Sequence, residues 1–280
     1  MSKLFKTSVI CAAAALCGAD ASAALFGLVP DGVQLGLGVS GTSGVNGFVG
    51  YANKNSDSFW WKRLGFRVDF ASTTPIKSKL NSELNEAINK DGKGLEIADD
   101  LHVTDVALGA KHFGAMVDFY PFGNTWFLGG WRLSGGYFTG KFNLGANLKS
   151  DLLPGGDYEF ELDDIKYKYS GGEMRATSSA DWNYRGPYVG TGFDLGLLFG
   201  LKIYFDAGVV FANKSAQLDL DVPVTGLYQQ VGGTWVAVEN NATLEAILAE
   251  AESEVLHDGQ KELDKYKMFP IVKLGFMYRF

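Results

Sequence analysis

Three histidines near carboxylates are the side chains of this chain best suited to acid–base chemistry. His112 lies six residues before Asp118, and His102 and His257 are also close in sequence to aspartates. Serine, histidine and aspartate side chains can together form the site of a hydrolase or acyltransferase. No spacing in the sequence brings such a group together, and solvated loop histidines are common. The sequence therefore predicts no catalytic residue.

Two other patterns could bind ligands. Gly36, Gly38 and Gly41 match the G-x-G-x-x-G pattern of dinucleotide sites, but no helix pattern follows them, so glycines facing a crowded interior explain them better. Acidic clusters such as residues 159–164 could hold divalent cations, yet none has the ligand spacing of a calcium loop. We therefore expect no metal site and no cofactor.

A more informative set of charged residues lies inside segments in which polar and apolar side chains alternate. Alternate side chains of a strand point to opposite faces, so these charges share a face that is distinct from the apolar one. Positive and negative charges nearly balance, which predicts a network of ion pairs that offsets the cost of burial. The nine residues are Arg67, Asp69, Asp118, Arg132, Asp194, Lys202, Asp206, Lys273 and Arg279.

The last eleven residues show the alternation most clearly. Phe276, Tyr278 and Phe280 lie on one face together with Leu274 and Val272, and the chain ends on the aromatic residue. This ending resembles the carboxy-terminal assembly signal of bacterial outer-membrane β-barrels. The sequence therefore predicts a closing barrel strand with Phe276, Tyr278 and Phe280 as its assembly signal.

The amino terminus predicts export. Lys3 and Lys6 precede an apolar stretch, and Ala21-Ser22-Ala23 matches an A-x-A cleavage site. The apolar run is too short for a membrane-spanning helix, so we expect a cleaved signal peptide over residues 1–23 and a barrel domain over residues 24–280. Cys11 and Cys17 both lie in the removed segment, so the mature chain is expected to have no thiol.

Period-two runs bounded by turn residues predict an all-β fold: a closed antiparallel transmembrane β-barrel, which usually has an even number of strands. The eight predicted strands cover residues 32–41, 46–54, 59–75, 103–122, 126–148, 180–199, 201–222 and 264–280. Short joints belong on the periplasmic side and long joints outside the cell. Residues 78–90 and 241–257 have apolar side chains at helical spacing, which predicts short helices in extracellular loops.

Aromatic residues gather where strands meet the short joints, as in a membrane-interface girdle. Trp60, Trp61, Trp126 and Trp131 are its tryptophans. A second, outer belt is predicted from Tyr137, Phe138, Phe142, Phe211, Tyr266 and Phe269. Within the fifth predicted strand, the aromatic residues change from odd-numbered positions (Trp131, Tyr137) to even-numbered positions (Phe138, Phe142) around Gly135-Gly136. Odd and even positions face opposite sides of a strand, so this change predicts a β-bulge there.

Composition excludes one class of partner. The chain has 25 Lys and Arg against 32 Asp and Glu, a formal net charge of −7, which argues against nucleic-acid binding. The predicted partners are instead outer-membrane lipid and lipopolysaccharide, the barrel assembly machinery and periplasmic chaperones.

Several motifs support a family resemblance. They are Asp118-Phe-Tyr-Pro-Phe-Gly123, Trp131-Arg-Leu-Ser-Gly-Gly136, Gly186-Pro-Tyr-Val-Gly-Thr-Gly192 and the terminal Tyr278-Arg-Phe280. Together they resemble a poorly characterised proteobacterial group of outer-membrane barrels of the small OmpA/OmpW-like type. The resemblance covers most of the chain outside the long loops. It implies the fold and the outer-membrane location, and it transfers no catalytic residues.

The leading functional hypothesis is a non-enzymatic outer-membrane barrel with a structural or surface-interaction role, whose lumen is closed by the charged network. An eight-stranded barrel is only wide enough for side chains or one small ligand. The alternative hypothesis is a channel or binding protein for small, mostly apolar solutes. A lipid-directed enzyme at the outer rim is a third.

Overall fold

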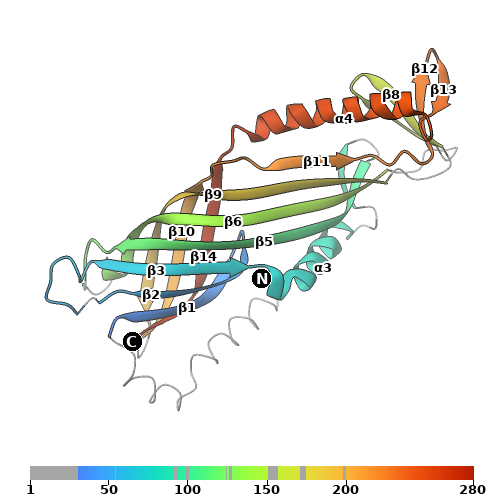
Figure 1. Ribbon diagram of the computed structural model, residues 1–280. Helices are drawn as coiled ribbons and strands as arrows, with labels where there is room; N and C mark the ends of the chain where they lie inside the picture. The colour runs from blue at the N-terminus through green and yellow to red at the C-terminus, as the bar shows by residue number, and fades with distance from the viewer. Residues whose placement is uncertain are drawn as a thin grey trace.

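Eight strands form a closed antiparallel ring (Figure 1). The computed structural model describes residues 31–280 except 54, 91, 93, 99–100, 124, 126–127, 151–156, 171–174 and 198–199. The predicted signal peptide therefore lies outside the described residues. The ring runs β10-β14-β1-β2-β3-β5-β6-β9, and β9 pairs again with β10. Its strands are β1 (Val33–Ser40), β2 (Gly44–Tyr51), β3 (Leu64–Ser72), β5 (Leu101–Phe119), β6 (Trp131–Ser150), β9 (Arg175–Gly196), β10 (Leu201–Phe211) and β14 (Met268–Arg279).

The two faces of the wall differ as the alternation predicts. In β3, Phe66 and Phe70 are 45% and 51% exposed, whereas Arg67 and Asp69 between them are 3% and 0% exposed. An apolar face exposed all around a closed ring suits contact with acyl chains. Among the described helices, none has the length and apolar character needed to cross a bilayer.

The two ends of the chain close the ring. In the β1–β14 pair, Leu35 is opposite Tyr278 and Leu37 is opposite Phe276. Gly32 N–H donates to the Phe280 carbonyl at 2.8 Å, and Phe280 N–H donates to the Val33 carbonyl at 3.0 Å. The terminal aromatic residue is thus fixed by backbone hydrogen bonds at the seam of the barrel.

Several predicted strand boundaries are wrong. The third strand starts at Leu64 rather than at residue 59, because Leu64 N–H bonds back to the Trp60 carbonyl in a turn. The predicted strand 201–222 is two strands, β10 and β11 (Gln217–Asp221). They separate where Ala212 N–H turns to the Lys267 carbonyl. The predicted bulge is also wrong, since β6 and β9 pair in unbroken register through Gly135 and Gly136.

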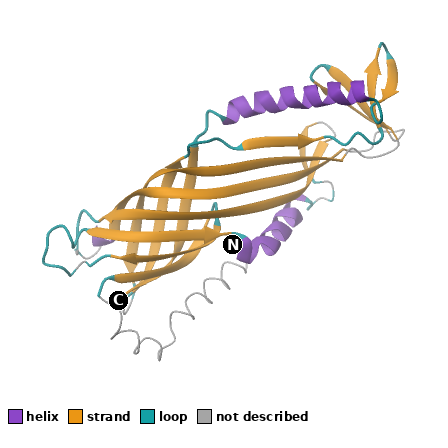
Figure 2. Ribbon diagram, in the orientation of Figure 1, coloured by secondary structure: helices purple, strands orange, loops and turns teal. Residues whose placement is uncertain are grey.

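Three neighbouring strands continue far beyond the ring at its long-loop end. β5, β6 and β9 have 19, 20 and 22 residues, against 8 to 12 in the other ring strands. Ten extra residues extend a strand by roughly 33 Å. Figure 2 shows this projecting sheet continuing past the barrel, with β11 along one edge. The short strand β4 (Leu95–Ala98) pairs with β5 at its outer end.

The free edge of β5 is covered by asparagines of a helix. After the 3₁₀ turn η1 (Thr74–Ile76), α3 (Lys77–Ile88) confirms the helix predicted over 78–90, with slightly different bounds. Leu108 N–H donates to Asn81 Oδ1 at 3.1 Å and Val106 N–H to Asn85 Oδ1 at 2.7 Å. Asn89 Nδ2 donates to the Thr104 carbonyl at 2.6 Å. Residues four apart lie on one helix face, so this ladder satisfies an edge that could otherwise pair with another chain.

Replacing Asn81 and Asn85 with alanine should release α3 from β5. The partly buried N–H groups of Val106 and Leu108 would lose their acceptors, which weakens docking by about 1 kcal/mol for each lost hydrogen bond. We expect faster amide exchange at both positions and concentration-dependent association measured by sedimentation. The matched control, Ser82→Ala with Glu86→Ala on the same helix, should leave both unchanged. Unchanged exchange in the asparagine variant would refute this role for the ladder.

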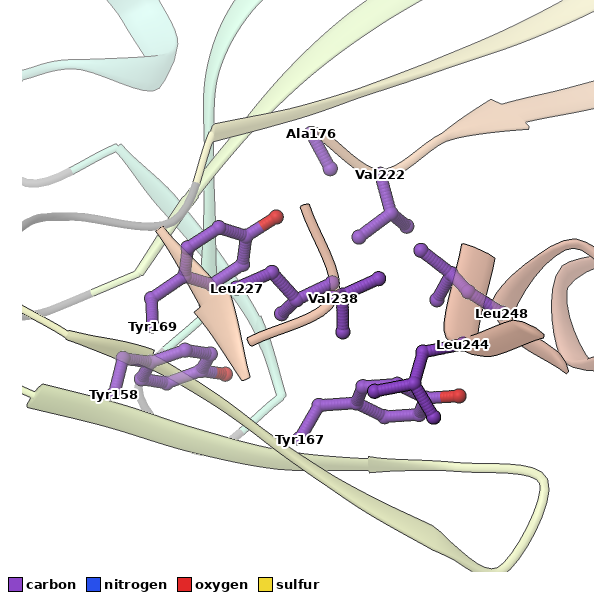
Figure 3. Packing of buried hydrophobic residues seen from close by; sticks show 9 residues of the cluster. All are labelled: Tyr158, Tyr167, Tyr169, Ala176, Val222, Leu227, Val238, Leu244 and Leu248. Atoms are coloured by element: carbon purple, nitrogen blue, oxygen red, sulfur yellow. The ribbon is translucent and has the colours of Figure 1, made fainter. Parts of the chain in front are cut away.

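A second hydrophobic core lies outside the barrel. α4 (Ala242–Leu263) extends six residues beyond the helix predicted over 241–257, and Asn241 caps its start. It packs on a four-stranded sheet whose hairpins were not predicted from the sequence: β7 (Asp157–Leu162), β8 (Ile165–Ser170), β12 (Leu227–Val231) and β13 (Thr234–Ala237). Figure 3 shows Leu244 and Leu248 of α4 beside Leu227, Val238 and a group of tyrosines. We call this unit the outer module.

α4 also covers the free edge of β11. Leu218 N–H donates to Gln260 Oε1 at 3.3 Å, and Gln260 Nε2 donates to the Ala216 carbonyl at 2.7 Å. Val222 N–H donates to Glu252 Oε1 at 3.1 Å. Both edges of the projecting sheet are therefore closed by helix side chains.

The remaining described element is the 3₁₀ turn η2 (Leu128–Gly130), which precedes β6.

The contact between Glu252 and β11 should weaken as pH rises. Burial raises the pKa of the Glu252 carboxyl, the hydrogen bond from Val222 N–H offsets part of this rise, and the nearby Asp221 and Asp219 add to it. The folded state thus holds the proton of Glu252 more tightly than the unfolded state does. The stabilisation from protonated Glu252 is therefore fully present below the ordinary glutamate pKa of about 4.3, and it is lost as pH rises through the raised pKa of the folded state. We expect the protection factor of the Val222 amide to fall over that range. Glu252→Gln should remove the pH dependence, and Glu250→Gln, at an exposed position, should keep it.

Candidate functional site in the barrel lumen

Arg67 is at the centre of the charged lumen. Its Nε and Nη2 donate to the two carboxylate oxygens of Asp118, at 2.5 and 2.9 Å. Its Nη1 donates to Asp206 Oδ2 at 2.9 Å. These residues come from β3, β5 and β10, so one guanidinium joins three strands across the barrel. Such bidentate pairs are among the strongest hydrogen bonds that charged groups make.

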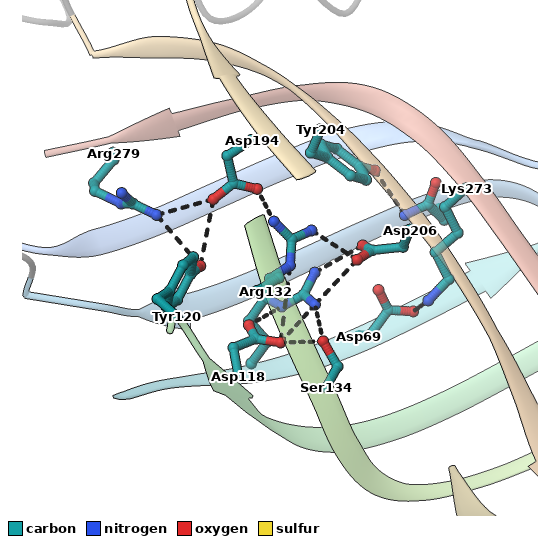
Figure 4. Close-up of polar contacts among 12 residues, drawn as sticks. Asp69, Asp118, Tyr120, Arg132, Ser134, Asp194, Tyr204, Asp206, Lys273 and Arg279 are labelled. Atoms are coloured by element: carbon teal, nitrogen blue, oxygen red, sulfur yellow. Dashed lines mark hydrogen bonds and ion pairs between the residues drawn. The ribbon is translucent and has the colours of Figure 1, made fainter. Parts of the chain in front are cut away.

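Arg132 and Arg279 extend this group toward the short-turn end. Arg132 Nη2 donates to Asp206 Oδ1 at 2.7 Å, and Arg132 also forms an ion pair with Asp194. Arg279 Nη2 donates to Asp194 Oδ2 at 3.2 Å, and Tyr120 OH donates to the same oxygen at 3.3 Å. Figure 4 shows the continuous chain of contacts from Arg279 through Asp194 and Arg132 to Asp206.

Asp69 binds the remaining cation toward the long-loop end. Lys273 Nζ donates to Asp69 Oδ1 at 2.6 Å, and His112 Nε2 lies 3.0 Å from the same oxygen. The network thus contains four aspartates and four cations: Asp69, Asp118, Asp194, Asp206, Arg67, Arg132, Lys273 and Arg279. We call these eight residues the lumen network. Its formal charge balances, as the burial of charges requires.

His112 also contacts a serine, so serine, histidine and aspartate do meet in the lumen. Ser43 Oγ lies 2.9 Å from His112 Nδ1. Ser43 and Asp69 are both fully buried, and Lys273 binds the same Asp69 oxygen as the histidine. A substrate has no access to the hydroxyl in this arrangement, so the geometry favours a structural role for the group. The sequence placed His112 near Asp118, whereas the structure places it against Asp69.

An aromatic layer closes the lumen on the long-loop side of the network. Phe138 is fully buried, with its ring centroid 4.8 Å from Tyr188 and 5.4 Å from His112. Tyr184 stacks on Phe269 at 4.1 Å. We call Phe138, Tyr184, Tyr188 and Phe269 the aromatic layer; Met116, Val210 and Ile271 pack with it. Lys273 Nζ lies 5.0 Å from the Phe138 ring, so the two layers touch.

The aromatic layer corrects the predicted outer belt. Phe138 and Phe269 were assigned to the lipid side, but both point into the lumen, and Phe142 packs against Phe269. Tyr137 and Tyr266 are exposed, at 55% and 65%, as expected for interface residues. Aromatic residues occur on both faces of β6 because some of them fill the lumen, and the strand has no bulge there.

Glycines make room for these rings. A Cβ at Gly114 would collide with the ring of Phe138, and one at Gly36 with the ring of Phe48. A Cβ at Gly192 would lie 2.9 Å from Arg132 Nη2 and would also collide with Asp206. Gly36 and Gly38 of the G-x-G-x-x-G segment therefore serve close packing in the lumen, in agreement with the interpretation from sequence, whereas a Cβ at Gly41 would meet no atom within 4 Å.

Most of the predicted site residues meet, and one does not. Of the nine predicted charged residues, Lys202 is half-buried, and its side chain makes no ion pair or hydrogen bond with any residue in the described part of the chain. Sequence reasoning missed Tyr120, Tyr204 and Asn46; Asn46 Nδ2 donates to Tyr204 OH at 2.8 Å. Inward parity alone could have identified them. Within the described ranges, no three acidic, cysteine or histidine side chains are grouped to hold a metal ion.

Trp60, Trp61 and Trp131 of the predicted girdle lie at the short-turn end of the barrel. Trp60 and Trp61 are 63% and 54% exposed in the turn before β3. Trp131 starts β6, and its Nε1 donates to Thr191 Oγ1 at 2.9 Å. Trp126 lies outside the described residues. Phe276, Tyr278 and Phe280 share the outward face of the closing strand, with Tyr278 and Phe280 in ring contact at 4.8 Å.

Comparison with solved structures identifies the fold. CarO2 of Acinetobacter baumannii superposes with a TM-score of 0.52 at 13% identity, over 89% of this chain and 99% of that chain. The chain has the fold of an outer-membrane β-barrel. CarO of the same organism gives a TM-score of 0.49 at 13% identity, over 90% of this chain and 99% of that chain. A major outer membrane protein of Thermus thermophilus gives a TM-score of 0.39 at 14% identity, over 89% of this chain and 97% of that chain. No protein-family model and no curated protein sequence matches the chain.

Proposed function

We propose that this chain is an integral outer-membrane protein with a closed lumen, and that it acts through its extracellular part in a structural or surface-interaction role. The observation that carries the proposal is the filling of the lumen at two successive levels, by the lumen network and by the aromatic layer. Arg132, Lys273 and Phe138 are each no more than 2% exposed. An eight-stranded ring is only wide enough for its interior to be filled by side chains or one small ligand, and this supports a closed lumen.

The elements outside the barrel support a surface role. The projecting sheet and the outer module form a folded structure with its own buried core, and loops that carry function are commonly held on such rigid scaffolds. We further propose a cleaved signal peptide over residues 1–23, delivery by periplasmic chaperones and insertion by the barrel assembly machinery through Phe276, Tyr278 and Phe280. The likeness to small OmpA/OmpW-type barrels belongs to the same proposal.

Solute flux tests the closed lumen against the alternative, a channel for small, mostly apolar solutes. Folded protein in proteoliposomes should give no uptake above protein-free vesicles of either a small sugar or a small aromatic solute. Folding is checked beforehand by heat-dependent gel mobility. Uptake of the aromatic solute alone would support the alternative, and uptake of both would refute a closed lumen.

A further inference from the structure

Four cations gather on the outer wall of the barrel, away from the lumen network. Lys111 of β5, Lys141 of β6, Arg185 of β9 and Lys214 after β10 are all exposed. Lys111 is directly opposite Lys141 in the β5–β6 pair. Arg185 is paired through its backbone with Asn213, which adjoins Lys214. We call these four residues the wall cluster.

The wall cluster has no acidic partner in the described parts of the chain. None of its four side chains takes part in the ion pairs of the described residues. Like charges directly opposite each other in a β-sheet are destabilising. In a chain of net charge −7, this concentration of positive charge calls for an external anion.

The height of the wall cluster on the barrel indicates where that anion lies. On the outward face, Lys111 comes two residues before Phe113, and Arg185 is four residues from Val189. Phe113 and Val189 are 54% and 60% exposed, so each belongs to the lipid-facing band. Lys111 is eight residues from Phe119, which lies at the short-turn end of β5. On a tilted strand, eight residues rise roughly 20 Å along the barrel axis, and the apolar band of such a barrel is about 25 Å tall. The wall cluster therefore lies near the upper boundary of the apolar band.

A groove runs through the wall cluster. It has a volume of about 480 Å³, and its lining includes all four cations together with Phe113, Thr139 and Asn183. Apolar and cationic groups thus face one space, in which acyl chains would lie along the wall below and phosphate groups among the cations above. Lys and Arg side chains are the usual partners of phosphate oxygens.

We propose that the wall cluster binds the phosphorylated head group of an acylated glycolipid in the outer leaflet, of the lipid A type. The proposal rests on the membrane orientation given under Proposed function, but it does not depend on whether the lumen is closed. The lipid's phosphates neutralise the facing lysines, and its acyl chains cover Phe113 and Val189. The bound lipid becomes a fixed part of the barrel wall beneath the projecting sheet.

Native mass spectrometry of the folded full-length chain in detergent tests the site, with bisphosphorylated lipid A as the probe. Lys111→Gln, Lys141→Gln and Arg185→Gln together should weaken binding about 100-fold, at roughly tenfold or less for each surface charge removed. The control Lys79→Gln, Lys90→Gln and Lys261→Gln removes three exposed charges from α3, the turn after it and α4, and should leave binding unchanged. Equal affinity in the two triple variants would overturn the proposal.

The wild-type chain provides a second test that does not depend on the folding of a variant. Monophosphorylated lipid A should bind more weakly than the bisphosphorylated form, and binding should weaken as salt is raised. Phosphatidylglycerol, which has one phosphate and no sugar backbone, should bind more weakly still. Equal binding of all three lipids would show a general anionic surface and would overturn the glycolipid site. Loss of lipid binding with an unchanged absence of solute flux would leave the closed lumen intact.

Discussion

Replacing Arg67 with methionine should destabilise the barrel by about 3–5 kcal/mol, because Asp118 would remain buried without its hydrogen-bonded guanidinium partner and Asp206 would keep only Arg132. Arg67 makes three hydrogen bonds of 2.9 Å or less to these two carboxylates, and both are almost fully buried. Methionine has a similar shape without the charge. Urea unfolding in lipid vesicles, followed by tryptophan fluorescence, measures the change in the free energy of unfolding.

Two further variants separate pairing from volume. Lys202→Met removes a half-buried cation that lies outside the lumen network and should change stability by no more than about 1 kcal/mol. Arg67→Met combined with Asp118→Leu should be more stable than Arg67→Met alone, because the single variant leaves Asp118 without both guanidinium hydrogen bonds, whereas Asp206 keeps Arg132 as its partner. If Arg67→Met lowered the free energy of unfolding no more than Lys202→Met does, the lumen network would not stabilise the fold.

Replacing Phe138 with alanine should cost about 3–5 kcal/mol and leave a cavity between the two layers of the lumen. The ring contacts Tyr188 and His112, and it lies under Lys273 Nζ. A cysteine at Met116 reports on access, since residues 31–280 contain no cysteine. We expect the thiol of Met116→Cys to resist a small maleimide reagent and to react once Phe138→Ala is added.

Phe113→Ala is the matched control for this prediction. It removes the same side chain from the outward face of β5, where Phe113 is 54% exposed. It should leave the Met116→Cys thiol protected and should cost less stability than the lumen substitution. Equal labelling in the two alanine variants would mean that Phe138 does not seal the lumen.

The sequence predicted the wall of the barrel better than what lies beyond it. Alternation fixes which residues face inward, so the burial of Arg67, Asp118 and Asp206 followed directly from their parity. The same rule should have placed Phe138 in the lumen. It did not, because aromatic residues were assumed to face lipid and a bulge was introduced to keep them there. Parity also grouped Lys202 with the network, since parity fixes the face of a strand and not which charges touch.

The outer module was beyond this kind of reasoning for a physical reason. β7 and β8 are six residues long, and their alternation is brief and rich in charge, as in Glu159-Phe160-Glu161 and Lys166-Tyr167-Lys168. Their stability comes from packing against α4 and from pairing with β12, which are distant in sequence. The asparagine ladder of α3 was likewise hidden, because its i, i+4, i+8 spacing shows only after the β5 edge is known to be free.

Single-channel recording in planar bilayers tests the central claim, a lumen closed by two layers of side chains. The folded wild-type protein should give no discrete conductance steps, whereas Arg132→Ala combined with Phe138→Ala, which opens both layers, should give them if that variant folds by heat-dependent gel mobility. Discrete, reproducible steps from the wild-type protein would contradict the closed lumen and would make the lumen network the selectivity element of a channel.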